Sequence, residues 1–207
     1  MGNRSTSRHA HNEAQQQAFD RVAPLFEQAP AQEILKRLEV VVDSARIQPN
    51  ESILDVGTGT GVLLPFILEH LPCRVLACDL SKEMLKRAGD QFGNRVGTLQ
   101  ADVVDIPVSD SPFDVIFCNA AFGNVYDQKE TLAAMDTLLA PTGRLVISHP
   151  MGSAFVKRLK KESPQYHLKD LPNKAQLKQL LRGTRLRMVH FIDEPDFYMA
   201  LSVKSPE

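Results

Sequence analysis

The chain lacks several features that define common protein classes. No apolar run approaches the roughly 18 residues of a membrane span, and no hydrophobic signal segment opens the sequence. Lysine plus arginine number 24 and aspartate plus glutamate number 25, so the strongly basic balance of nucleic-acid-binding proteins is missing. We therefore expect no membrane span and no nucleic-acid partner.

Cysteine is also scarce. The three cysteines, Cys73, Cys78 and Cys118, lie in or near predicted strands, and none belongs to a C-x-x-C pair. This placement is typical of reduced thiols in a protein core, not of a disulfide framework or a zinc site. We expect a cytoplasmic or other reducing compartment and no metal site.

Length and composition favour one domain. At 207 residues, with 43% hydrophobic residues, the chain suits a single α/β unit with a substantial core. Residues 1–12 are expected to be disordered, although the start at Gly2 fits the loose pattern for N-myristoylation. Within the domain, 13–207, we expect a helical lid in 13–47, a ligand-binding core in 51–150, and specificity helices with a terminal hairpin in 151–207. The oligomeric state is left open.

The most informative segment, residues 53–61, reads I-L-D-V-G-T-G-T-G. Its apolar half is typical of a strand buried on both faces, and its glycines remove each Cβ that would block a ligand. A helix over residues 61–71 is predicted to follow. A dinucleotide-binding loop, G-x-G-x-x-G, would need a third glycine at Val62. Asp55, two residues before Gly57, suits an ammonium and repels a phosphate.

Two further predicted strands end in acids. Residues 74–79 end at Asp79, where a carboxylate can accept both hydroxyl groups of a ribose, or can simply cap the next helix. Residues 98–101 are followed by Asp102 and by an apolar loop that begins at Val103. Asp102 either meets a ligand there or only caps a turn.

In this order, these features resemble the class I S-adenosylmethionine (SAM) dependent methyltransferases, over residues 51–150. The resemblance implies an α/β, Rossmann-like fold, in which helices cover both faces of a seven-stranded, mostly parallel sheet with an antiparallel C-terminal hairpin. It implies SAM as cofactor and S-adenosylhomocysteine as product. In the family, the acid matching Asp102 takes the adenine amino group and its apolar neighbour packs on the ring. The implied cofactor-binding residues are Asp55, Gly57, Thr58, Gly59, Gly61, Asp79, Leu80, Asp102, Val103 and Asn119.

The segment from Ala18 to Pro24 resembles the F-D-x-x-A-P sequence of quinone-ring C-methyltransferases. In those proteins this region forms a lid over the SAM site. A helix that packs only for the core explains the same pattern.

A methyl acceptor is expected at the carboxyl ends of the fourth and fifth strands, residues 113–119 and 143–148. The residues expected around it are Phe19, Phe122, Tyr126 and His149. His149 and Tyr126 are the candidate catalytic residues, and a histidine before a proline at a strand end is also common as a turn element. Further candidates for a base are His9, His11 and Asp127.

We expect methyl transfer from SAM to a small-molecule acceptor. Enzymes that methylate exocyclic amines carry an N/D-P-P-Y/F loop after the fourth strand, whereas residues 119–122 read N-A-A-F and lack both prolines. A non-catalytic SAM-binding regulatory or partner protein is the first alternative, and a nucleotide-dependent oxidoreductase is the second. The residues specify neither the acceptor nor the methylated atom.

Overall fold

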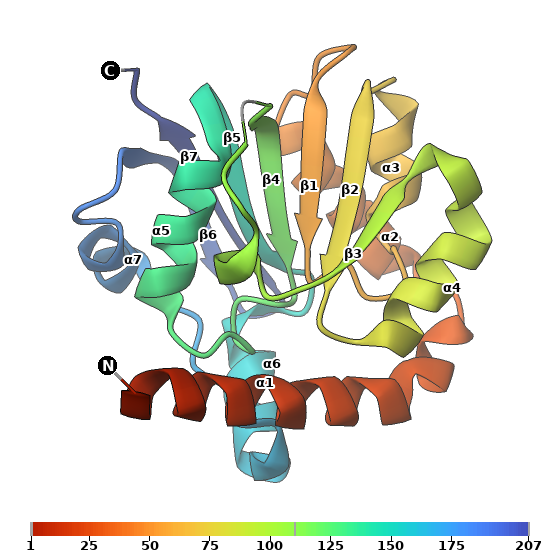
Figure 1. Cartoon of the computed structure of the whole chain (residues 1–207), viewed down its shortest axis with the longest axis vertical. Helices are drawn as coiled ribbons and strands as arrows, with labels where there is room; N and C mark the ends of the chain where they lie inside the picture. Colours follow the sequence, from red (N-terminus) through yellow and green to blue (C-terminus); the bar gives the residue numbers. More distant parts are fainter. Residues whose placement is uncertain (1, 110, 207) are drawn as a thin grey trace.

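The computed structural model describes residues 2–109 and 111–206, with the side chains of 2–6 and 27 left undescribed. Seven strands form one sheet in the order β3-β2-β1-β4-β5-β7-β6 (Figure 1). The strands are β1 (Ser52–Val56), β2 (Arg74–Asp79), β3 (Gly97–Gln100), β4 (Phe113–Asn119), β5 (Leu139–His149), β6 (Leu186–Glu194) and β7 (Phe197–Lys204).

The first five strands run parallel, and β7 lies antiparallel between β5 and β6. The expected seven-stranded, mostly parallel sheet with an antiparallel C-terminal hairpin is therefore confirmed. All five residues of β1 are buried, as the unbroken apolar character of the central strands requires. The carboxyl ends of β1, β2 and β4 consequently meet at one edge of the sheet.

Helices cover both faces of this sheet (Figure 1). One core joins the sheet to α2 (Gln32–Ser44), α3 (Leu64–Glu69) and α4 (Lys82–Phe92). The other core joins it to α5 (Gln128–Leu138), α6 (Gly152–Glu162) and α7 (Lys174–Leu180). Short 3-10 turns complete the connections: η1 (Ala23–Glu27), η2 (Gly93–Arg95), η3 (Val103–Asp105) and η4 (Pro164–Tyr166).

Side-chain caps fix where the helices near the carboxyl edge begin. The hydroxyl of Ser81 accepts a hydrogen bond from the N–H of Met84 and so caps α4. Asp127 caps α5 by accepting from the N–H groups of Lys129 and Glu130. Asp127 therefore has a structural role at the start of α5, because each capping bond satisfies an N–H that the helix leaves open.

The N-terminal residues differ from the expectation of disorder over 1–12. Residues Gly2–Val22 form helix α1, which crosses the carboxyl edge of the sheet, and Met1 lies outside the described residues (Figure 1). The helix is polar around its circumference, so the sequence shows no apolar stripe that would predict it. Polar contacts with distant loops hold it instead, as described below.

Two boundaries in the core also differ. The helix expected over residues 61–71 begins only at Leu64, because Gly61 has a φ of +88°, a left-handed conformation that a helix cannot include. The fifth strand, expected over 143–148, runs from Leu139 to His149. Its early start pairs Leu139 with Phe113, across an irregularity in the β4–β5 register.

The cysteines are free thiols, of which Cys78 and Cys118 are buried and Cys73 is exposed. Burial raises the pKa of Cys78 to about 12, which keeps the thiol protonated and unreactive at neutral pH. Among the helices of the described residues, none has both the length and the apolar character needed to cross a membrane.

Candidate active site

The loop after β1 adopts a conformation that requires glycine. Gly57, Gly59 and Gly61 have φ values of +66°, +57° and +88°. A Cβ on Gly57 would lie 2.3 Å from the Cβ of Ala121 in the loop after β4. The glycines therefore let two loops at the carboxyl edge approach more closely than any side chain would allow.

The loop uses its own N–H groups within the protein. Gly57 and Thr58 both donate to the carbonyl oxygen of Cys78, at 2.8 and 3.1 Å. Gly59 donates to the carboxylate of Asp79, and Gly61 donates to the carbonyl oxygen of Thr58. A phosphate-binding loop instead turns such groups towards its ligand, so this loop is poorly suited to a pyrophosphate.

Asp55 lies beneath the loop and is 2% exposed. Its Oδ2 accepts a hydrogen bond of 2.7 Å from the hydroxyl of Thr58, which ties the loop to β1. Burial raises the pKa of Asp55 to about 7, and the nearby charge of Asp79 acts in the same direction. A cation close to this carboxyl would favour its ionised form.

Asp79 stands at the end of β2, facing the glycine loop. Its Oδ2 accepts from the N–H of Gly59 at 2.8 Å, and its Oδ1 accepts from the N–H of Ser81 at 2.8 Å. Each carboxylate oxygen has a second lone pair, so both oxygens can still accept hydroxyl donors from a ligand. Burial raises the pKa of Asp79, which makes such donors more valuable to its charged form.

Asp102 follows β3 and begins η3. Its Oδ1 accepts from the N–H of Val104 at 3.2 Å, so the capping role is real, and its Oδ2 accepts from Nδ2 of Asn12 at 2.7 Å. Val103 beside it is 3% exposed. Leu80 accepts a hydrogen bond from Gln100 through its carbonyl oxygen.

Asn119 ends β4 and is buried. Its Oδ1 accepts a hydrogen bond of 2.9 Å from the hydroxyl of Ser148 on β5. The structure thus gathers the expected cofactor residues at the ends of β1 to β4. Whether each of them touches SAM stays a prediction.

Helix α1 contacts the segments that follow three of these strands. Asp20 accepts from the hydroxyl of Ser81 at 2.5 Å and from the N–H of Glu83 at 3.2 Å. Arg8 pairs with Asp105 at 2.7 Å, beyond β3. His11 Nε2 lies 2.7 Å from the carbonyl oxygen of Asn124, beyond β4. Helix α1 is thus held at several points across the carboxyl edge of the sheet, and its expected role as a lid stays a prediction.

Tyr126 and His11 lie together at the β4 side of this lid. Their ring centroids are 5.6 Å apart in an edge-on arrangement. The ring of His167 is 6.4 Å from that of His11, and the Lys169 ammonium nitrogen is 5.8 Å from the centre of the Tyr126 ring. Burial lowers the pKa of His11, and the Lys169 and His167 charges lower it further, so the ring is neutral near pH 7.

Phe122 and His149, both expected around the acceptor, lie in different environments. Phe122 was expected to line the site, but its side chain is fully buried in the core, because the loop after β4 folds back into the sheet. His149 is 9% exposed, and its Nδ1 accepts from the N–H of Met151 at 3.2 Å. Burial lowers the pKa of His149 to about 4, which leaves the ring neutral.

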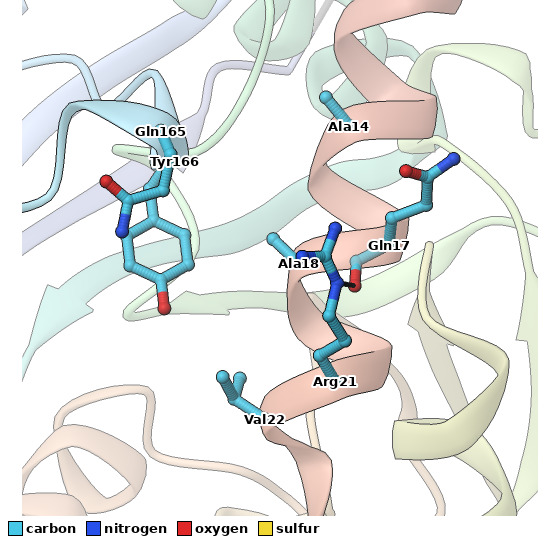
Figure 2. A pocket seen from close by; sticks show the side chains of 7 residues that line it. All are labelled: Ala14, Gln17, Ala18, Arg21, Val22, Gln165 and Tyr166. Carbon is cyan, nitrogen blue, oxygen red and sulfur yellow. Dashed lines mark hydrogen bonds between the residues drawn. The ribbon is translucent and has the colours of Figure 1, made fainter.

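A hollow of about 250 Å³ opens between α1 and η4 (Figure 2). Its walls are Ala14, Gln17, Ala18, Arg21, Val22, Gln165 and Tyr166. Figure 2 shows the Tyr166 ring on one side of this hollow and the Ala18 and Val22 side chains on the other. Phe19 also lies near this turn, with its ring centroid 6.3 Å from that of Tyr166.

Sequence reasoning did not predict the tertiary contacts of several polar residues at the interface of α1. Asn12 and Gln15 sit on a helix without amphipathic pattern, and Asn124 belongs to a loop without a motif. Asp20 was part of the F-D-x-x-A-P segment, which is the one signal that could have identified it. Their partners are far away in the chain, so spacing alone carries no information about them.

Comparison with known proteins agrees with this geometry. Residues 54–147 match the family model described as "Methyltransferase domain". Demethylmenaquinone methyltransferase of Thermus thermophilus is 34% identical over 110 residues, covering 51% of this chain and 50% of that protein. The ubiquinone/menaquinone biosynthesis C-methyltransferase UbiE of Geotalea daltonii is 32% identical over 149 residues, covering 64% of this chain and 61% of that protein. The chain therefore spans about half to three fifths of these relatives' lengths.

A solved structure shows the same fold. The Burkholderia thailandensis 1,6-didemethyltoxoflavin-N1-methyltransferase, crystallised with 1,6-didemethyltoxoflavin and S-adenosylhomocysteine, superposes with a TM-score of 0.73. It is 19% identical, over 96% of this chain and 90% of that one. Residues 54–147 therefore match a methyltransferase domain, and they lie within a fold that this solved N1-methyltransferase shares.

Proposed function

We propose that this protein transfers a methyl group from SAM to a small-molecule acceptor at the carboxyl edge of β1, β2 and β4. The observation that carries this proposal is the position of Asp79. Its carboxylate is held by the N–H groups of Gly59 and Ser81, with a lone pair on each oxygen left for a ribose hydroxyl.

The surrounding residues fit the remaining parts of SAM. Asp102 would accept the adenine amino group, and the buried side chain of Val103 would pack beside the ring. Asp55 beneath the loop would favour the ammonium of the methionine moiety, since a cation lowers the cost of ionising this buried carboxyl. Because the N–H groups of all three loop glycines and of Thr58 are bonded within the protein, the loop offers a phosphate little, which disfavours a nicotinamide dinucleotide.

When bound, SAM supplies an electrophilic methyl group that an acceptor nucleophile attacks in line. The contribution of this chain would be to position the acceptor, exclude water and receive a proton where the nucleophile carries one. Tyr126 and His149 remain the proposed acceptor-side residues. His149 is neutral, with its Nδ1 already accepting a backbone N–H, so only Nε2 could face a ligand.

The named relatives support methyl transfer without choosing the atom. One is named as a C-methyltransferase and another as an N1-methyltransferase. We therefore propose a small-molecule acceptor and leave carbon, nitrogen and oxygen for the experiment to distinguish.

Calorimetry and labelling together test this function. We expect the purified protein to bind SAM and S-adenosylhomocysteine more tightly than NAD, and to transfer labelled methyl from SAM to a compound in a metabolite extract. One labelled product would identify both the acceptor and the methylated atom. Tighter binding of NAD than of SAM would overturn the proposed function.

A further inference from the structure

Two buried amide oxygens beneath the lid have no hydrogen-bond donor. They are Oε1 of Gln15, on α1, and Oδ1 of Asn124, in the loop after β4, and neither has a partner among the described residues. Gln15 is 2% exposed. A buried acceptor without a donor costs about 1–3 kcal/mol, so such atoms in a native protein point to a missing partner.

The orientation of both amides is fixed by their other atoms. The Nε2 of Gln15 donates to the carbonyl oxygen of Tyr166, and the Nδ2 of Asn124 donates to the carbonyl oxygen of Ala120 at 3.2 Å. A carbonyl oxygen can only accept, so neither side chain can be flipped without losing its bond. The free atom is therefore an acceptor in both cases.

Both atoms belong to the region beside the candidate cofactor loop. The Asn124 side chain is bonded to Ala120, and the neighbouring Ala121 is the residue that a Cβ on Gly57 would strike. His11 lies one helical turn before Gln15 and contacts the carbonyl oxygen of Asn124. The His11 contact therefore places Gln15 and Asn124 at the same interface, between α1 and the loop after β4.

Rings and an access route surround these oxygens. The rings of His11 and Tyr126 lie against one another at this interface, and Gln15 is bonded to the backbone of Tyr166. Tyr166 accepts from Gln15 through its backbone while its side chain lines the hollow between α1 and η4 (Figure 2).

We propose that Gln15 Oε1 and Asn124 Oδ1 are the recognition atoms for the methyl acceptor, and that this acceptor presents hydroxyl or N–H donors to them. This inference rests on the proposed function for its naming of the ligand as the acceptor. Two carbonyl-type oxygens repel a carboxylate or phosphate, so the acceptor is not anionic at the part that meets them. The site favours molecules that can be methylated on oxygen or nitrogen, or on a ring that carries such groups.

Binding can be measured without turnover. Resorcinol, a small ring with two hydroxyl donors, and 1,3-dimethoxybenzene, the same ring without them, are added to the ¹⁵N-labelled protein with S-adenosylhomocysteine. We expect resorcinol to shift the side-chain amide signals of Gln15 and Asn124, and dimethoxybenzene to leave them in place. Equal shifts from both probes, or no shift from either, would overturn the inference.

Substitutions give a second readout in the extract assay. Gln15→Met should raise KM for the acceptor about tenfold, the scale of one lost hydrogen bond, with SAM affinity unchanged. Gln179→Met makes the same chemical change at an exposed position of α7, away from the hollow, and is the matched control. Unchanged KM in the Gln15→Met protein would contradict the proposed site.

Chemical blocking adds a test where the labelled product is methylated on carbon, because capping then removes the donor groups without removing the methylated atom. Acetic anhydride caps the hydroxyl and amine groups of the metabolite extract, so the labelled product should disappear from a capped extract. The same product from capped and untreated extracts would overturn the donor requirement. If the untreated extract gives no labelled product while resorcinol shifts the two amides, methyl transfer fails and the binding site stands.

Discussion

The carboxylate of Asp20 accepts a hydrogen bond of 2.5 Å from the hydroxyl of Ser81, across a separation of 61 residues. Ser81 also donates its N–H to Asp79 and caps α4 with its hydroxyl oxygen. One residue therefore contacts the lid, the cofactor-side carboxylate and the start of a helix. A displacement of α1 at Asp20 would shift Ser81 and so change its hydrogen bond with Asp79.

Removing the Asp20 carboxylate should loosen the lid. Asp20→Ala loses both the Ser81 and the Glu83 contacts, so we expect faster amide hydrogen exchange in α1 and unchanged exchange in β1 and β4. Mass-spectrometric exchange measurements would show this. Gln17→Ala, on the exposed side of the same helix, is the control. Equal exchange in the Asp20→Ala and wild-type proteins would mean that the other contacts alone hold α1.

Removing the Asp79 carboxylate should weaken SAM binding. Asp79→Ala removes a charged partner for two ribose hydroxyls, so the binding free energy should fall by roughly 2 kcal/mol or more. Calorimetric titration with S-adenosylhomocysteine measures this directly. Asp90→Ala, at an exposed position of α4, makes the same change away from the site. Affinity that is equal in the two variants would leave Asp79 with only its structural bonds to the N–H groups of Gly59 and Ser81.

The glycine loop allows a comparison of two substitutions. Gly59→Ala meets no atom within 4 Å, so it costs only the left-handed strain of about 1–2 kcal/mol. Gly57→Ala adds an overlap with Ala121, and its total loss of stability should reach about 3 kcal/mol or more. Urea unfolding of both proteins tests the difference. Equal losses would show that the loop after β4 can move away from Gly57.

The stability of the protein should depend on His149 at mildly acidic pH. Burial lowers the pKa of His149 from 6.5 to about 4, so between these values the unfolded chain binds the proton and the folded chain does not. The resulting stability is present above pH 6.5 and is lost as the pH falls towards 4, by roughly 3 kcal/mol in total.

Urea unfolding of wild-type and His149→Gln proteins between pH 7 and pH 5 isolates this effect. The wild-type protein should lose more stability than the variant over that interval. Asp55 acts with the opposite sign, because burial raises its pKa to about 7, and it contributes equally to both proteins. Parallel pH profiles would show that His149 is accessible to protons in the folded state.

The sequence predicts the sheet well and brings the candidate cofactor residues to one edge of it, because both depend on local pattern. Buried strands read as apolar runs, and the glycines and the acids Asp55, Asp79 and Asp102 follow them at fixed positions. The predicted helix boundaries were less accurate where one backbone dihedral angle determines where the helix begins, as the φ of Gly61 does. Such an angle depends on the neighbouring loop as much as on the residue.

The lid contacts could not be predicted, because they depend on tertiary structure. The residues that hold α1 in place have partners about 60 to 150 positions away in the sequence, as in the pairs of Asp20 with Ser81 and Gln15 with Tyr166. For Phe122, by contrast, the sequence predicted a place in the site that the structure does not support. Its position after β4 suggested an open site, whereas the fold of the loop turns its ring into the core.

Helix α1 is polar around its whole circumference and is held mainly by hydrogen bonds and ion pairs. If such a helix separated from the sheet, water would replace these hydrogen-bond partners and little apolar surface would become exposed. The protein could therefore bind and release its ligands repeatedly, because the open state with α1 away from the sheet would not be prone to aggregate. The same design makes the exchange rate sensitive to ionic strength, since dissolved salt screens the charges that close the helix over the sheet.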